Sequence, residues 1–399
     1  MTTADDLGLR PPRWTRRVDP IARRLFPLAV IVGVAARFAI SRRGSNYDFW
    51  AWQIDADLIA GGVNIYSDDY PYNYGPIWQF VLLLAHWISN VTVDSTDVFR
   101  LTLIVVLTVT DVAIAMLVGR HWGWACAAVV FLNPISIVIS GYHHQFDNLA
   151  VLMLLVAAKY FDHDAHDARR GPLVASAVVG LSLATKHIGF LMSPWFALRA
   201  RRGMRLVVLA IPPMIFVASF LPWATSRSTI TNIVDHVLLH RGGRPGVLRS
   251  ILDVPQNGVA FWMVYGVWLG ALGLGGIITR ALPSRSAVLV YLVVMLAFSP
   301  GFANHHLVLL VVAASVFMSP ELVVAAVLGT LFLAQNSDGL GLDLFVPGWF
   351  ELEGHMYAWI QAVLWVWFAR LAWRLRRQAS MRLAAATAAA RPSAPSAKS

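Results

Sequence analysis

The chain has 399 residues, of which 57% are hydrophobic and only 14% are charged. A soluble domain distributes its charged residues along its length, whereas here they gather in short stretches between long apolar runs, so the composition excludes an ordinary soluble enzyme and predicts a polytopic membrane protein. The net charge of +10 does not predict nucleic-acid binding, because the basic residues flank apolar runs, where they orient the protein and contact anionic headgroups.

The first predicted element is an uncleaved anchor. Residues 1–24 are polar and basic, no small-residue cleavage site follows the first apolar run, and we expect this segment in the cytoplasm. Residues 25–378 are predicted to form an all-α domain of about twelve transmembrane helices, since a span needs about 20 residues. The apolar runs lie near 25–40, 76–91, 99–119, 123–140, 149–161, 172–198, 206–222, 258–278, 287–300, 305–319, 321–335 and 356–374.

Two of these runs decide the topology. Run 76–91 is short and contains two tryptophans, which favours a helix lying at the membrane interface. Run 172–198 is long, and a single span would place Lys186 near mid-membrane at a cost of roughly 3 kcal/mol or more. We therefore predict two short helices divided at residues 185–187. With these two choices, the arginine clusters between the spans all face the cytoplasm.

The polar motifs then face the other side of the membrane, in two long outer loops, residues 41–98 and 223–257. The alternative topology has 76–91 as a span and 172–198 as one helix, and it reverses the middle of the chain. The tail, residues 379–399, is rich in Ala, Pro and Ser and is predicted to be a disordered cytoplasmic extension.

Asp48, after the first run, is the candidate general base. Its aromatic neighbours would raise the pKa of the carboxylate while nearby arginines oppose the shift, an environment suited to accepting a proton from a hydroxyl. The alternative is an ion pair with Arg42 or Arg43 at the headgroups. Asp55 and Asp57, further along, are expected to be solvated or structural.

A second polar motif lies between two later runs and consists of His143, His144, Gln145 and Asp147. We expect it to hydrogen-bond sugar hydroxyls or a phosphate. Two alternatives stay open. The first is a metal site, although adjacent histidines lack the i, i+4 spacing of a helical ligand pair. The second is a set of polar helix caps, with Asp147 as the N-cap of the next helix. We expect no metal and no cofactor.

Basic side chains also gather on the predicted outer face, where the orientation rule allows few. Their convergence would compensate a phosphate or pyrophosphate, or they could contact anionic lipid headgroups. The sequence contains no nucleotide-binding glycine-rich loop, and nucleotide sugars are not supplied outside the cytoplasm, so a transferase here would need a lipid-carried donor. These basic residues are Lys186, His187, His305, His306, Arg241, Arg244 and Arg249.

The order of these features resembles the integral-membrane GT-C glycosyltransferases, especially the dolichol-phosphate-glucose glucosyltransferases of the N-glycan pathway and the bacterial polyprenol-phosphate-mannose α-mannosyltransferases. The resemblance covers about two-thirds of the chain. It departs where the glucosyltransferase His-Phe-Gln-Tyr-Asn reads His-His-Gln-Phe-Asp, where Lys-Gln reads Lys-His, and where Tyr-Pro-Pro reads Tyr-Gly-Pro. The matching segments are 47–48, 64–66, 72–76, 100–102 with Asp111, 133–134, 141–148, 185–187 and 304–306.

The resemblance implies a GT-C type fold with juxtamembrane helices in the first outer loop, a catalytic acidic residue there, matched by Asp48, and a donor-phosphate site on the outer ends of the middle spans. The expected protein is a glycosyltransferase of the bacterial plasma membrane with its active site on the non-cytoplasmic face. It would transfer mannose or glucose, with inversion, from a polyprenyl-phosphate donor to a lipid-linked or cell-envelope glycan, in contact with membrane lipids and without nucleic acid. The alternative is a transporter or flippase of lipid-linked saccharides.

Overall fold

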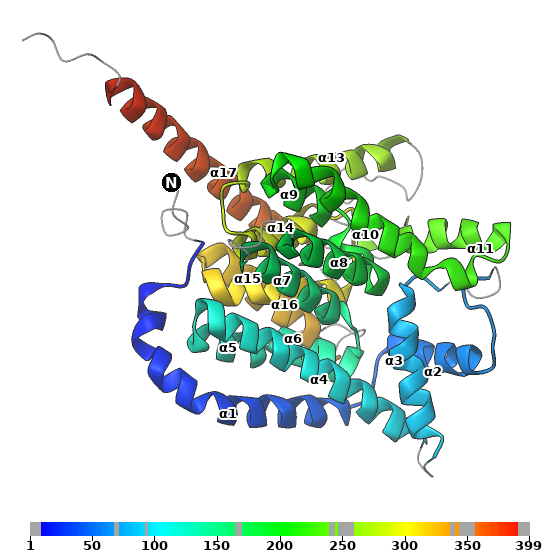
Figure 1. Cartoon of the computed structure of the whole chain (residues 1–399). Coiled ribbons are helices and arrows are strands. Elements are labelled where there is room, and N and C mark those ends of the chain that lie inside the picture. The colour runs from blue at the N-terminus through cyan, green and yellow to red at the C-terminus, as the bar shows by residue number, and fades with distance from the viewer. Residues whose placement is uncertain are drawn as a thin grey trace, which may run out of the picture.

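The computed structural model describes residues 9–67, 72–91, 95–163, 170–238, 244–245, 259–335, 340–342 and 356–389. These residues form an almost entirely helical bundle (Figure 1). The α-helices are α1 (Arg13–Ser41), α2 (Tyr47–Ala60), α3 (Pro76–Ser89), α4 (Ser95–Trp122), α5 (Trp124–Phe131), α6 (Pro134–Val138), α7 (Asp147–His163), α8 (Arg170–Thr185), α9 (Met192–Arg199), α10 (Arg205–Ser219), α11 (Arg227–Asn232), α13 (Val259–Ile278), α14 (Ser284–Phe298), α15 (Val308–Phe317), α16 (Pro320–Gln335) and α17 (Met356–Ala389).

Short turns of helix connect several of these elements. Two are π-helical, η1 (Ile139–His143) and η5 (Ile233–Leu238), and four are 3₁₀ turns, η2 (His187–Gly189), η3 (Arg202–Met204), η4 (Leu221–Trp223) and η6 (Asn304–Leu307). The two-residue strands β1 (Arg244–Pro245) and β2 (Gly301–Phe302) pair antiparallel. The predicted all-α class is therefore confirmed.

Several helices have the length and composition of membrane spans. Among the described residues, 4 helices meet this test, 13–41, 95–122, 202–223 and 259–278, and a bent pair, 124–131 with 134–143, gives a fifth if it is one span. The protein is thus an integral membrane protein, while the total of about twelve spans stays a prediction. The run 172–198 divides as expected, into α8, the turn η2 and α9. Run 76–91 forms the 14-residue helix α3.

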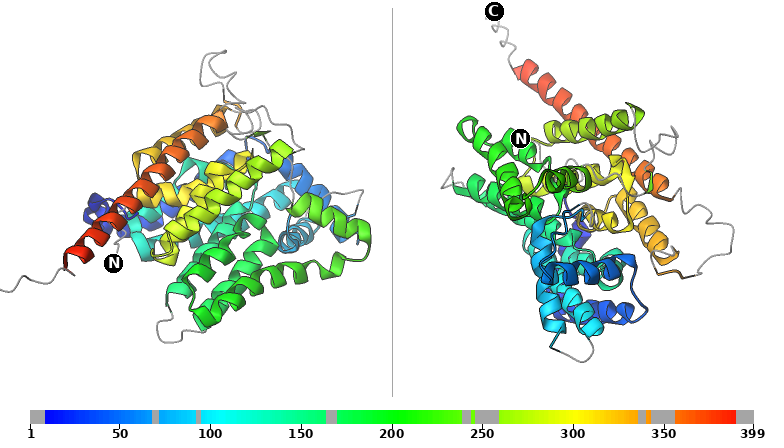
Figure 2. Two further views of the ribbon diagram at one scale, coloured as in Figure 1. Left: turned by 90° about the horizontal axis from the view of Figure 1, so that it is seen from above. Right: turned by 90° about the vertical axis from the view of Figure 1, so that its right-hand side faces the viewer.

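The structure differs from the expected domain limits at both ends. Helix α1 begins at Arg13, so the second half of the segment 1–24 belongs to the first helix. Helix α17 continues to Ala389, through the first part of the tail predicted to be disordered, and its end projects beyond the bundle (Figure 2). The alanines of the tail explain this difference, because Ala has the highest helix propensity of all residues. Residues 390–399 lie outside the described part of the chain.

The main hydrophobic core surrounds α14 and α15, whose residues 286–297 and 307–317 are almost all buried. A second, aromatic core joins α2 and α3 to the beginning of α4, and it includes Phe49, Trp52, Trp78 and Phe146. The stacked rings of Trp78 and Phe146, 4.1 Å apart, connect the first loop to the segment before α7. Helices α2 and α3 therefore lie packed at one end of the bundle, on the right of Figure 1.

A buried polar network lies between α1, α4 and η1. Arg37 donates from Nε and Nη2 to Oδ2 of Asp111, at 3.1 and 2.8 Å. Ser136 and Ser140 donate to the same oxygen, at 3.1 and 2.7 Å, and Asn148 donates to Oδ1 at 2.8 Å. All five side chains are buried. Because a buried charge is tolerated only when it is paired and hydrogen-bonded, this network fixes η1 and the start of α7 against α1.

Candidate active site

Asp48 lies in the first turn of α2 and faces the end of η1. The amide Nδ2 of Asn46 donates to Oδ2 of Asp48 at 2.8 Å and lies 2.7 Å from Nδ1 of His143. An amide nitrogen only donates, so Nδ1 of His143 accepts and the neutral ring carries its proton on Nε2. The carboxylate lies 4.0 Å from the same Nδ1 and is 26% exposed. Asp48 is therefore in contact with Asn46 and His143 and remains accessible, as a base that receives a substrate proton must be.

The approach of His143 to Asp48 depends on Gly141. A Cβ at residue 141 would lie 2.7 Å from the carbonyl oxygen of Arg37, so only glycine lets η1 pack this closely against α1. The two predicted motifs, 97 residues apart at Asn46 and His143, meet here. The next residue, His144, has the left-handed φ of 55°, and its ring packs on Phe49 at 5.1 Å. The adjacent histidines thus contact different neighbours.

Asp147 forms a second centre with Lys186. Nζ of Lys186, directly after α8, lies 2.7 Å from Oδ2 of Asp147, and their side chains are 4% and 0% exposed. The ammonium also lies over the rings of Tyr74 and Phe146, at 5.1 and 5.3 Å from the ring centres. The alternative of Asp147 as an N-cap is wrong, because α7 begins at Asp147 itself and its carboxylate pairs with Lys186.

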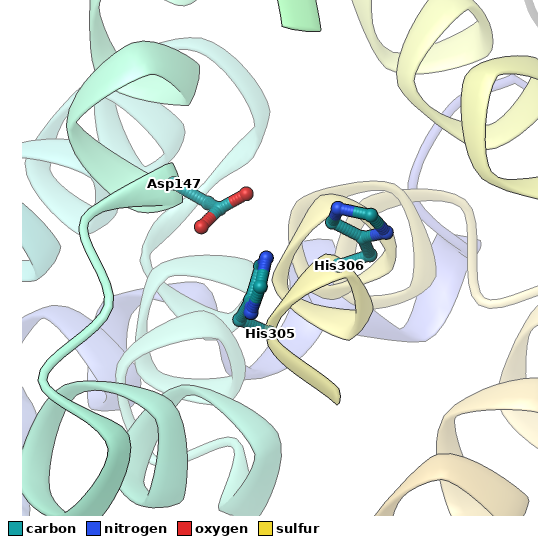
Figure 3. Close-up of side chains that lie close together, drawn as sticks. All are labelled: Asp147, His305 and His306. Carbon is teal, nitrogen blue, oxygen red and sulfur yellow. The ribbon is translucent and has the colours of Figure 1, made fainter. Parts of the chain in front are cut away.

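His305 and His306 approach the same carboxylate from η6 (Figure 3). One side-chain ligand atom from each of Asp147, His305 and His306 lies within 4.8 Å of the others, a donor set that resembles a zinc site. However, Lys186 already pairs with Asp147, and the amide of Ala303 donates to Nδ1 of His306 at 3.2 Å. Neutral His306 therefore carries a proton on Nε2, which makes that atom a hydrogen-bond donor and not a metal ligand. The absence of a metal stays a prediction.

The second centre borders a cavity of about 410 Å³, because Lys186 is one of its lining residues. Its polar part is lined by Asn73, Tyr74, Lys186, His187, His305 and His306. Its apolar part is lined by residues of α13, α14 and the turn after η2, among them Phe190, Trp262, Tyr265, Trp268, Leu269 and Met295. Trp262 is 48% exposed, and several neighbouring side chains of α13 are exposed as well. One cavity thus combines cationic donors with an aromatic wall, and it has the shape and chemistry of an amphiphile site.

Tyr74 connects the cavity to the Asp48 centre. Its ring packs against Trp52 and Phe146, with ring centroids 4.9 and 5.2 Å apart. Burial raises the pKa of Tyr74 above its usual value, and the charge of Asp48 raises it further, so the phenol stays protonated. Sequence reasoning did not include Tyr74 or the α13 aromatics among the site residues. Tyr74 lies in segment 72–76, one of the segments that match the GT-C glycosyltransferases. This match was the sequence signal that could have identified Tyr74 as a site residue.

Asp55 was expected to be solvated or structural, and its environment fits only the structural alternative. Burial raises the pKa of its carboxyl to about 7. Its charge affects Tyr66 and Tyr72, so it faces the interior of the first loop. Asp57, two residues further, is 73% exposed and lies 2.9 Å from His86. Only Asp57 behaves as a solvated residue of α2.

The predicted site residues are thus partly brought together. Lys186, His187, His305 and His306 line one cavity, and Asp147 lies beside it. The backbone of Arg244 pairs with Phe302 next to η6, whereas Arg241 and Arg249 lie outside the described residues.

Fold and site together define an all-helical integral membrane protein with an amphiphile cavity and a carboxylate centre at one end of the bundle. The structure is similar to that of ArnT from Cupriavidus metallidurans in the apo state, with a TM-score of 0.51 and 13% identity, covering 89% of this chain and 78% of that chain. It is equally similar to ArnT from the same organism bound to undecaprenyl phosphate, with a TM-score of 0.51 and 13% identity over 88% of this chain and 75% of that chain. No protein-family model matches the sequence, and no curated protein matches it. The expected GT-C type fold is confirmed.

Proposed function

We propose that the protein is an integral-membrane glycosyltransferase that transfers a sugar from a polyprenyl-phosphate donor to a lipid-linked or cell-envelope glycan. The observation that carries this proposal is the cavity of about 410 Å³, which joins four basic side chains to an aromatic wall. A lipid phosphate requires both parts, because its phosphate needs hydrogen-bond donors and its isoprenoid chain needs apolar surface.

The fold supports the same donor class. The similar protein ArnT binds undecaprenyl phosphate, and transfer of this chemistry to the present chain is part of the proposal. The transferred sugar, mannose or glucose, rests on the motif resemblance alone. The positions of the arginine clusters support an active site on the non-cytoplasmic face, and the motif resemblance supports a bacterial plasma membrane.

In the proposed reaction, Asp48 accepts the proton of the acceptor hydroxyl, held by its contacts with Asn46 and His143. The hydroxyl oxygen forms the new bond to the anomeric carbon from the face opposite the phosphate. The bond between that carbon and the phosphate oxygen breaks, and its electron pair leaves with the lipid phosphate, so the anomeric configuration inverts.

The basic residues of the cavity stabilise the charge that develops on the leaving phosphate. Lys186 supplies a fixed positive charge, and the imidazoles of His187, His305 and His306 supply hydrogen bonds. Asp147 balances Lys186 before the donor binds, since an unpaired ammonium would be costly to bury. The charges of Lys186 and Asp147 therefore balance each other before the donor binds. The attraction between Lys186 and the phosphate oxygens grows as negative charge develops on those oxygens.

The test is replacement of Asp48 by Asn, which keeps size and hydrogen bonding but cannot accept a proton. We expect single-turnover transfer to fall by roughly 10²–10⁴ with donor affinity nearly unchanged. Purified protein receives radiolabelled polyprenyl-phosphate-mannose or polyprenyl-phosphate-glucose with a membrane lipid extract as acceptor, and the products are separated by thin-layer chromatography.

The matched control is Asp57→Asn, which removes an exposed carboxylate of the same helix and should leave transfer unchanged. If Asp48→Asn transfers sugar at near the wild-type rate, Asp48 is not the base. If the wild-type protein transfers neither sugar but moves the labelled lipid across reconstituted vesicles, the flippase alternative replaces the proposal.

A further inference from the structure

A strongly basic cavity lies at the other end of the bundle from Asp48. The start of α1, the middle of α17 and the connection between α15 and α16 line a cavity of about 590 Å³ there. Helix α1 begins on the left of Figure 1, whereas α2 lies on the right. Five arginines line this cavity, Arg10, Arg13, Arg16, Arg370 and Arg374. The lining contains one carboxylate, Glu321, whose Oε1 accepts from Arg370 at 2.5 Å. Positive charge is therefore in clear excess.

Two further hollows share lining residues with this basic cavity. One, of about 260 Å³, also contains Arg10 and Arg16 and adds Arg285 and His121. The other, of about 680 Å³, contains Arg16 again and adds Arg23, Arg24 and the carboxylate of Asp19. Arg16 thus lines all three hollows, which are together called the basic groove. The basic cavity alone, at about 590 Å³, has room for an anion with more than one charged group.

Membrane orientation alone does not explain this groove. The orientation rule requires only that basic residues flank the spans on one side, and it does not gather the first and last helices around one concave surface. Arginines at close range repel one another, and a multivalent anion relieves this repulsion. The guanidinium fork also matches the oxygens of a phosphate in a bidentate contact.

The surroundings of the groove favour a lipid over a free anion. The buried side chains of Phe317, Trp367 and Leu371 form its apolar floor. Trp14 and Trp373, next in sequence to the lining residues Arg13 and Arg374, are 52% and 59% exposed. Tryptophans of this kind lie at the headgroup level of a bilayer, and basic pockets between membrane helices bind phosphorylated headgroups.

We propose that this groove binds the headgroup of an anionic phospholipid with more than one phosphate, with the acyl chains against the exposed apolar surface of α1 and α17. The phosphates contact Arg16 of α1 and Arg374 of α17. This site is separate from the donor cavity, and the proposal does not depend on the proposed function.

The experiment measures lipid binding to the full-length protein by native mass spectrometry in detergent. The lipids are a diphosphatidylglycerol, phosphatidylglycerol with one phosphate, and zwitterionic phosphatidylcholine, and inorganic pyrophosphate is the free anion. We expect the diphosphatidylglycerol to bind most tightly. The variant Arg16→Gln/Arg374→Gln should weaken its binding by about thirtyfold, since each basic residue near a lipid headgroup contributes about a factor of five.

The control variant Arg201→Gln/Arg202→Gln removes the same charge from exposed positions that do not line the groove, and it should bind the lipid like the wild type. Arg370 is left unchanged because it pairs with Glu321. The conservative variant Arg16→Lys/Arg374→Lys should bind the diphosphatidylglycerol with an affinity between those of the wild type and the Gln variant. Equal binding of all three lipids, equal losses in the two Gln variants, or tighter binding of pyrophosphate than of the lipid would overturn the proposal.

Discussion

The buried pair of Lys186 and Asp147 allows a direct test of how the proposed phosphate site is built. At 2.7 Å and an effective dielectric constant of 20, the attraction between the two charges is about 6 kcal/mol, which offsets the cost of removing both from water. Replacement of Lys186 by Met keeps the length of the side chain but leaves the carboxylate buried without its partner. We expect this variant to lose about 3–5 kcal/mol of unfolding free energy.

The double variant Lys186→Met/Asp147→Leu removes both charges together. Its unfolding free energy should return to within about 2 kcal/mol of the wild type, because apolar side chains of similar volume replace a buried pair with little loss. Urea unfolding in detergent, followed by tryptophan fluorescence, measures both effects. The control is Asp97→Asn, which breaks a pair 3.2 Å long with Arg100 whose carboxylate is 59% exposed, and it should cost under about 1 kcal/mol.

Binding of polyprenyl phosphate to the same variants separates the two roles of Lys186. If Lys186 contacts the phosphate, the double variant should be stable yet bind the lipid at least about tenfold more weakly than the wild type. If the stable double variant binds the lipid like the wild type, Lys186 only balances Asp147, and the assignment of Lys186 to the phosphate site is wrong.

Two further predictions concern the first loop and the orientation of the chain. The raised pKa of Asp55, about 7, means that the folded state holds a proton which the unfolded state releases near pH 4, so unfolding free energy should fall as pH rises from about 4 to 7. Urea unfolding of Asp55→Asn should lack this part of the pH dependence, and an unchanged profile would contradict the burial argument. For orientation, an impermeant thiol reagent on intact cells should label Val91→Cys but not Arg120→Cys, both exposed positions, in a Cys126→Ala background. The reverse labelling would favour the alternative topology.

Much of the fold could be predicted from the sequence because membrane-spanning helices are long, almost uncharged apolar runs. The sequence also placed the break at residues 185–187, since the cost of burying Lys186 in the bilayer is a local property of the sequence. It did not predict how far α1 and α17 extend, because helix ends depend on capping and packing as well as on polarity.

The candidate site could be predicted only in part. The motif residues were identifiable because polar side chains are rare in such a chain, but their partners were not, because contacts between distant helices leave no local pattern. The alternative for Asp48 was a pair with Arg42 or Arg43, yet its contacts are Asn46 and His143. Asp147 was a possible helix cap, yet it pairs with Lys186 from the next helix.

The buried network around Asp111 explains why these distant contacts form. Arg37 lies near the end of α1, directly before the loop that carries Asp48, and its guanidinium is bound by Asp111 on α4. The same carboxylate holds Ser140 of η1, which ends at His143, and Gly141 lets η1 approach the backbone of Arg37. The carboxylate proposed as the base and its histidine neighbour are therefore placed by a deeply buried ion pair. A rigid core of this kind holds the two groups at a fixed separation before any substrate arrives, which is what preorganised proton transfer requires.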